Sequence, residues 1–163
     1  IRATDQAGHV VLSEPLLLAI YDPSGGFVTG GGWINSPPGA YYPDPTMTGK
    51  ATFGFVSKYK KGANVPTGET EFQFKAGNLN FKSTSYDWLV VAGTKAQFKG
   101  TGTINGAGTY SFMLSAIDDK NGSDTFRIKI KTTDELVYDN LMDALDTADP
   151  TTVLGGGSII VHK

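Results

Sequence analysis

Alternation of apolar and polar residues is the feature that most constrains the fold of this chain. In 71–75 two phenylalanines alternate with Glu, Gln and Lys, and in 126–131 one phenylalanine and two isoleucines alternate with Arg and two lysines. The same period of two recurs in 51–61, 78–82, 95–104 and 110–115. A period of two places every apolar side chain of a strand on one face. The sequence therefore predicts antiparallel strands with one buried and one wet face.

Turn signals separate these runs. The segments 75–78 (KAGN), 105–108 (NGAG) and 120–123 (KNGS) lie between alternating runs, as in β-hairpins. Glycine is abundant, at 21 of 163 residues. Gly54, Gly100 and Gly102 fall inside predicted strands and suggest bulges or sharp coiling of the sheet. We predict an all-β fold, either an antiparallel β-sandwich or a flattened barrel.

Two stretches break the alternation. Four prolines in 35–45 predict a long loop. In 141–148, Leu141, Leu145 and Ala148 have near-helical spacing, and Asp149-Pro150 follows. We therefore expect one short helix or turn near 141–148.

Charge and composition exclude several classes of protein. The net charge is −2, which argues against nucleic acid as a partner. The chain has no cysteine, so disulfides and thiolate sites are excluded. No apolar run reaches the length of a membrane helix, so no membrane insertion is expected. Residues 50–99 carry eight lysines and three acids, whereas 118–149 carry nine acids and four bases. This asymmetry fits two solvated sheet faces; the alternatives are pairing with a neighbouring molecule or an anionic ligand.

The first residues differ in kind from the rest. The segment 3–9 (ATDQAGH) resembles the strand–turn–strand signature near the end of bacterial Ig-like repeats. We interpret 1–21 as the tail strands of a preceding Ig-like repeat, 22–26 as a linker, and 27–163 as a single β domain.

The region 27–163 also resembles a known kind of module. The similar pieces are 30–34 (GGGWI), 54–59 (GFVSKY), 86–91 (YDWLVV), 100–105 (GTGTIN) and 155–163 (GGGSIIVHK). They resemble an uncharacterised C-terminal β module of bacterial secreted and cell-surface proteins that follows Ig-like or PKD-like repeats. The resemblance implies an extracellular or cell-surface location and brings no catalytic residues.

Candidate chemistry is limited. The chain has no Gly-x-Ser-x-Gly motif, and its two histidines, His9 and His162, lie in the repeat tail and the terminal strand. We predict no enzyme. Oxygen-ligated Ca²⁺ is a candidate cofactor, because hard oxygens crowd one turn at Asp118, Asp119, Asn121 and Asp124. The alternative is an ordinary turn, which uses the same residue types.

Aromatic side chains are the candidate ligand-binding residues. Rings serve as stacking platforms for sugars, and Trp33, Tyr41, Tyr42 and Trp88 are candidates. Tyr41 and Tyr42 lie in the proline-rich loop, where exposure is expected. The alternative is that both tryptophans belong to the core and that both tyrosines pack against the domain.

We expect a non-catalytic extracellular structural or adhesion module. Its partners would be other protein modules or copies of itself. The segment 10–21 could complete a sheet edge in another copy and build a filament, because an open edge offers unpaired backbone groups. The alternative is a carbohydrate-binding module of a secreted enzyme, with a glycan as its ligand.

Overall fold

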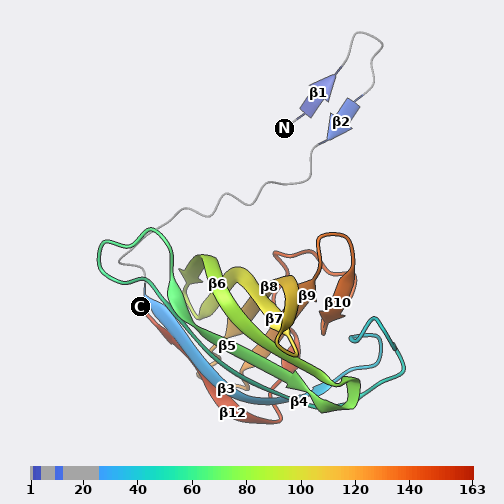
Figure 1. Ribbon diagram of the computed structural model, residues 1–163. Coiled ribbons are helices and arrows are strands. Elements are labelled where there is room, and N and C mark those ends of the chain that lie inside the picture. The colour runs from blue at the N-terminus through green and yellow to red at the C-terminus, as the bar shows by residue number, and fades with distance from the viewer. Residues whose placement is uncertain (1, 5–9, 13–25) are drawn as a thin grey trace.

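The structure is a computed structural model that describes residues 2–4, 10–12 and 26–163 (Figure 1). Within them, twelve strands and one 3₁₀ turn form. The elements are β1 (Arg2–Thr4), β2 (Val10–Leu12), β3 (Phe27–Ser36), β4 (Gly49–Lys58), β5 (Thr67–Phe74), η1 (Lys75–Gly77), β6 (Leu79–Ala92), β7 (Lys95–Ile104), β8 (Ala107–Ile117), β9 (Thr125–Lys131), β10 (Leu136–Asp139), β11 (Thr152–Val153) and β12 (Gly156–His162).

The strands from β3 to β12 form one antiparallel sheet, which confirms the predicted all-β class. Its order is β10-β9-β8-β7-β6-β5-β4-β3-β12, with β11 paired beside β9. From β3 to β10 each strand pairs with the next one in the chain, as the hairpin signals predicted. The last strand, β12, returns to pair with β3.

The two short strands at the beginning of the chain pair with each other. Arg2 of β1 lies opposite Leu12 of β2, and Thr4 lies opposite Val10. The remaining parts of the predicted Ig-like tail and linker, residues 1, 5–9 and 13–25, lie outside the described residues, so the predicted boundaries at 21 and 26 stay predictions.

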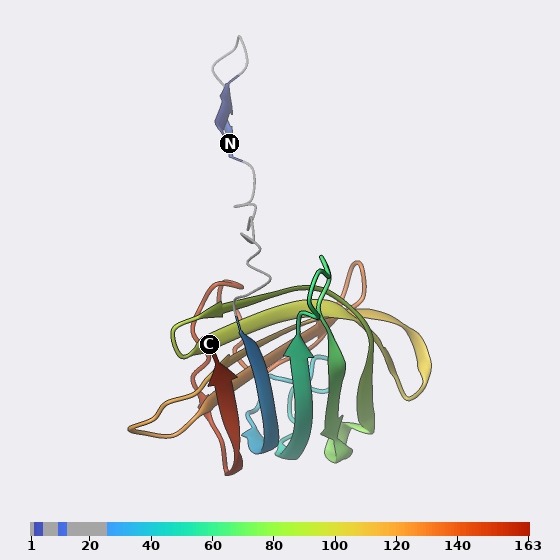
Figure 2. The ribbon, with the colours of Figure 1, turned by 90° about the vertical axis from the view of Figure 1, so that its left-hand side faces the viewer.

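Strand β6 is the corner at which the sheet folds over. Its first residues, 79–82, pair with β5, whereas 81–92 pair with β7, with register shifts at Ser83/Ser85 and Tyr86/Trp88. Where β5 and β6 no longer pair through their backbones, side chains of β6 still contact Thr70 of β5. The Thr70 N–H donates to Ser83 Oγ (2.8 Å), and the Thr70 hydroxyl lies 2.7 Å from Tyr86 OH. Because bulges bend a strand, β12, β3, β4 and β5 form one layer, and β7, β8 and β9 form the other (Figures 1 and 2).

Aromatic rings fill the space between the two layers. The rings of Phe53 and Phe126 stack with their centroids 4.0 Å apart, and Phe55 meets Phe98 at 5.6 Å. Such pairs contribute about 0.5–1.5 kcal/mol each beyond the area that they bury. Phe72, Phe74, Phe126, Ile128 and Ile130 are fully buried, as their alternation predicted.

Of the two forms predicted for 141–148, a short helix or a turn, the structure has the turn. The segment forms two successive turns, in which Ala144 N–H donates to Leu141 O and Ala148 N–H donates to Leu145 O. Carbonyls of the segment also accept hydrogen bonds from the sheet, since Arg127 Nη1 donates to Leu145 O (2.8 Å). Buried donors of β7 and β9 therefore override the helical pattern, and Leu145 is left 74% exposed.

The chain's own groups cover both edges of the sheet. At the β12 edge, Ile159 N–H donates to Asp124 Oδ2 (2.7 Å) and Val161 N–H donates to Asp118 Oδ2 (3.0 Å). At the β10 edge, backbone hydrogen bonds join 40–42 to 137–139. Covered edges protect a sheet against unwanted strand pairing. In the described part of the chain, no helix is long and apolar enough to cross a membrane.

Candidate functional site

The outer face of β12, β3, β4 and β5 carries a recess with a glycine floor. Pairing places Gly31, Gly54 and Glu71 side by side on three neighbouring strands. The recess has a volume of about 230 Å³, and Thr52, Phe53, Gly54, Glu71 and Gln73 line it. We call Gly31, Gly54, Thr52, Glu71 and Gln73 the glycine trough. It is open because two adjacent strand positions have no side chain there.

Trp33 stands beside the trough. It pairs with Thr52 of β4 and with Gly156 of β12, one row away from the glycines. A Cβ on Gly156 would lie 2.7 Å from Trp33 Nε1, so the ring lies close over the backbone of β12. Lys50 Nζ lies 4.6 Å from the ring centroid, in cation–π geometry. Trp33 is therefore a half-buried wall of the outer face and not a core residue.

The charged groups at the end of the trough neutralise each other. Lys82 Nζ lies 2.9 Å from a carboxylate oxygen of Glu71. The hydrogen bond to Glu71, together with the charge of that carboxylate, raises the pKa of Lys82 above its ordinary value. Both side chains are exposed, so the pair adds little stability. Its effect is to leave the trough polar and close to neutral.

The outer face of the other layer is covered by residues 140–149. Beneath them lies Arg127, fully buried on β9. Its guanidinium binds Asp139 through two parallel hydrogen bonds, Nε to Oδ1 (2.9 Å) and Nη2 to Oδ2 (2.8 Å). Its remaining donors reach the carbonyls of Ala144 and Leu145. Because Arg127 and Asp139 neutralise each other while the guanidinium also binds carbonyls of the segment, this cluster is a structural clamp for 140–149.

Ion pairs within the chain balance part of the uneven charge of the sequence. Lys95 Nζ lies 2.7 Å from Asp149 Oδ1, and Lys129 Nζ lies 2.8 Å from Asp146 Oδ1. Together with Arg127–Asp139, these pairs join the acidic stretch to basic residues of β7 and β9.

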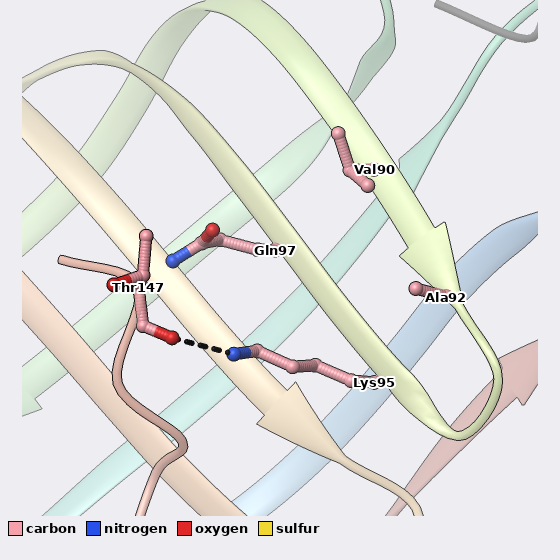
Figure 3. Close-up of a pocket in the computed structure, with 5 residues that line it drawn as sticks. All are labelled: Val90, Ala92, Lys95, Gln97 and Thr147. Carbon is pink, nitrogen blue, oxygen red and sulfur yellow. Dashed lines mark hydrogen bonds between the residues drawn. The ribbon is translucent and has the colours of Figure 1, made fainter. Parts of the chain in front are cut away.

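A second recess opens where residues 140–149 meet β6 and β7 (Figure 3). Its volume is about 200 Å³, and Val90, Ala92, Lys95, Gln97 and Thr147 line it. Lys95 Nζ donates to Thr147 O (3.1 Å), as the dashed line in Figure 3 marks, and Gln97 Nε2 donates to Asp146 O (2.6 Å). Because these nitrogens already serve the covering segment, the recess is a poorer candidate for a site than the glycine trough.

The four aromatic residues predicted to bind a ligand do not form one cluster. Trp33 lies on the outer face of β3, whereas Trp88 is half-buried on β6 and pairs with Lys99 of β7. Tyr41 packs edge-on against Phe74, with centroids 5.7 Å apart. Tyr42 is 38% exposed. Partial burial, followed by the nearby acids, raises its pKa. The four residues are thus divided among two strands and the proline-rich loop.

The acidic turn between β8 and β9 uses its oxygens within the chain. Asp118 and Asp124 accept backbone hydrogen bonds from β12. Asp119 Oδ1 accepts from Asn121 N–H (3.0 Å), and Asp119 N–H donates to Asp124 Oδ1 (3.0 Å). Among the residues that the structure describes, no three His, Asp or Glu side chains are grouped so that they could hold a metal ion. Calcium binding by this turn stays a prediction.

The two histidines lie in different settings. His162 stacks on Phe27 with the ring centroids 3.9 Å apart, so it packs at the end of β12. His9 lies outside the described residues.

Sequence reasoning missed the trough, although its signal is visible. Gly54 suggests a bulge or sharp coiling of the sheet, but the pairing of β4 with β3 and β5 is regular through it, so the bulge is wrong. At Gly102 it is right, since the register shifts between Gly102 and Ile104. The outward direction of Gly54, which follows from the alternation around it, was the usable clue. Comparisons of the chain with protein families, curated proteins and solved structures found no match.

Proposed function

We propose that the domain is a non-catalytic adhesion module, displayed outside the cell, that binds through the outer face of β12, β3, β4 and β5. The observation that carries this proposal is the contrast between edges and face. Both edges of the sheet are covered by the chain itself, whereas this face keeps an open recess lined by Thr52, Glu71 and Gln73. Rigid strands on which polar groups are held in place suit binding without turnover.

Contact through the face is favoured over filament formation by strand addition. A donated strand at β12 would have to displace Asp118 and Asp124 from the Val161 and Ile159 amides. A strand at β10 would have to displace residues 40–42. Self-assembly through 10–21 is therefore the second candidate, and it requires an exchange of existing hydrogen bonds.

The test asks whether the protein adsorbs to a surface without releasing a soluble product from it. Fluorescently labelled chain 1–163 is incubated with bacterial cell envelopes and with insoluble polysaccharides, and bound protein and released soluble sugar or peptide are measured together. We expect saturable binding with release at the level of buffer. Product that accumulates with protein concentration, or adsorption to none of the surfaces, would contradict the proposal.

Sedimentation velocity separates the two candidates. The expected result for chain 1–163 is a monomer over the concentrations at which it adsorbs. Species that grow with concentration, and that vanish when charged residues replace apolar ones in 10–21, would favour strand exchange instead.

A further inference from the structure

Two Asn-Gly pairs of the chain lie in turns between strands. Asn105-Gly106 joins β7 to β8, and Asn121-Gly122 lies between β8 and β9. Asparagine is one of the thermolabile residues of proteins. It is most labile before glycine, because glycine has no side chain to shield its backbone nitrogen and lets the chain bend toward the asparagine side chain. The structure gives the two pairs different surroundings.

The side chain of Asn105 is held in place by the hairpin in which it lies. Its Oδ1 accepts a hydrogen bond from Asn80 N–H (3.1 Å), and its Nδ2 donates to Asn78 O (2.8 Å). The backbone N–H of Asn105 also donates to Asn80 O (2.8 Å). Both ends of the side-chain amide are engaged, so its carbonyl carbon can approach Gly106 N only after these hydrogen bonds break.

The side chain of Asn121 is free of such restraints. The turn at 119–122 is exposed and extends beyond the body of the domain (orange in Figure 2). Among the residues that the structure describes, no hydrogen bond holds the side-chain amide of Asn121; its backbone N–H donates to Asp119 Oδ1 (3.0 Å). Gly122 N–H donates to Asp119 O at 3.3 Å, slightly longer than is usual for such a bond. The Asn121 side chain and the Gly122 nitrogen are therefore accessible to water and loosely held.

The same turn covers the edge of β12. Val161 N–H donates to Asp118 Oδ2 (3.0 Å), and Ile159 N–H donates to Asp124 Oδ2 (2.7 Å). The other oxygen of Asp124 accepts from Asp119 N–H (3.0 Å), so the turn is joined to a carboxylate that covers the edge. A change in backbone length within 119–123 would therefore alter the spacing of the two carboxylates.

We infer that Asn121 deamidates spontaneously and that its isoaspartate product loosens the cover of the β12 edge. In the first step Gly122 N gives up its proton to water and attacks Asn121 Cγ. The N–Cγ bond forms, the Cγ–Nδ2 bond breaks, and the Nδ2 group takes up a proton and leaves as ammonia, so that a succinimide ring remains. Water then opens the ring at either of its carbonyls and leaves aspartate or isoaspartate. Water is the only co-reactant, and the reaction is independent of the proposed function.

Isoaspartate changes the turn in two ways. Its backbone runs through the former side chain, so the chain between Asp118 and Asp124 becomes longer by a methylene group. Its new carboxylate adds a negative charge close to Asp119, and like charges in one turn repel each other. Both changes displace the Asp118 and Asp124 carboxylates from the Val161 and Ile159 amides. An amide released in this way is open to water and to a strand of another molecule.

The experiment follows both Asn-Gly pairs in one sample. Chain 1–163 is incubated in mildly alkaline buffer, which speeds the loss of the glycine proton, and peptide mapping by mass spectrometry measures aspartate and isoaspartate at 105 and 121. A parallel incubation in concentrated urea measures the same pairs in the unfolded chain. Hydrogen–deuterium exchange of the peptide 156–163 reports on the β12 edge. Asn121→Gln, incubated in the same way, is the matched control, since it keeps an amide but does not close the succinimide ring.

In the folded chain we expect Asn121 to react at least about tenfold faster than Asn105, a difference of about 1.4 kcal/mol in activation free energy, whereas in urea the two rates should be similar. Exchange of 156–163 should rise as isoaspartate accumulates and should stay unchanged in Asn121→Gln. Equal rates at the two pairs in the folded chain would overturn the assignment of Asn121. Isoaspartate at 121 without faster exchange in 156–163 would overturn its effect on the edge.

Discussion

Replacement of Gly54 by valine should make the domain more stable, although glycine is the residue present. Fixing a glycine backbone costs conformational entropy, and a substitution compatible with the local backbone recovers about 0.4–1 kcal/mol. Valine also has a higher strand propensity than glycine, on a scale that spans about 1 kcal/mol. Because no atom lies within 4 Å of the added Cβ, no packing penalty offsets these gains.

The expected gain in the free energy of unfolding is therefore about 1 kcal/mol. For a domain of this size, such a gain raises Tm by roughly 2–5 °C. The matched variant is Gly102→Val, whose Cβ would lie 2.5 Å from the Phe81 ring. It should lower stability by about 1–3 kcal/mol, as overpacking does.

Urea unfolding followed by tryptophan fluorescence, in one buffer for all three chains, measures both effects. The decisive quantity is the sign of the change in the free energy of unfolding that Gly54→Val causes. If Gly54→Val lowers the free energy of unfolding by 1 kcal/mol or more, glycine is needed there for the fold itself.

Other perturbations test the structural clamp, the core and the covered edge. Arg127→Met leaves Asp139 buried without its partner, so urea unfolding should show a loss of about 3–5 kcal/mol. Burial raises the pKa of Tyr138 above its ordinary value of 10.0; stability is therefore complete below pH 10 and should fall by roughly 1.4 kcal/mol per pH unit above it, and Tyr138→Phe should flatten that part of a Tm-against-pH curve. Asp124→Ala leaves the Ile159 amide without an acceptor and should cost about 1–3 kcal/mol, with new concentration-dependent dimers in sedimentation if the carboxylate protects the edge. Calcium bound at the turn between β8 and β9 would raise Tm in CaCl₂ relative to EDTA; identical melts would reject it.

The alternation of apolar and polar residues was enough to predict the strands, because a strand with one buried face has an apolar residue at every second position. Phe72 and Phe74 are core residues for that reason. Turns form at 141–148 in place of a helix because carbonyls of the segment accept hydrogen bonds from Arg127 and Gln97, residues of β9 and β7 that approach only after the sheet forms. The spacing of apolar residues within one segment gives no information about hydrogen-bond donors that lie far away in the sequence.

The site was harder to predict than the fold. Residue type marked Trp33 as a candidate, and the structure does place it on an outer face beside the trough. Nothing in residue type distinguishes Gly54 from the packed Gly102, because the difference lies in which face each glycine presents and what stands over it. Register across β3, β4 and β5, which no single strand encodes, brings the trough together.

The ends of β3 and β12 are neighbours, since Phe27 pairs with His162. Tension between these two ends would unzip the β3–β12 pair, breaking its hydrogen bonds one after another. Tension between residue 27 and a ligand bound on the outer face of β3 would instead run along β3, where β12 and β4 resist sliding on both sides. The domain would therefore yield easily when stretched by its ends and would hold firmly when used as an anchor.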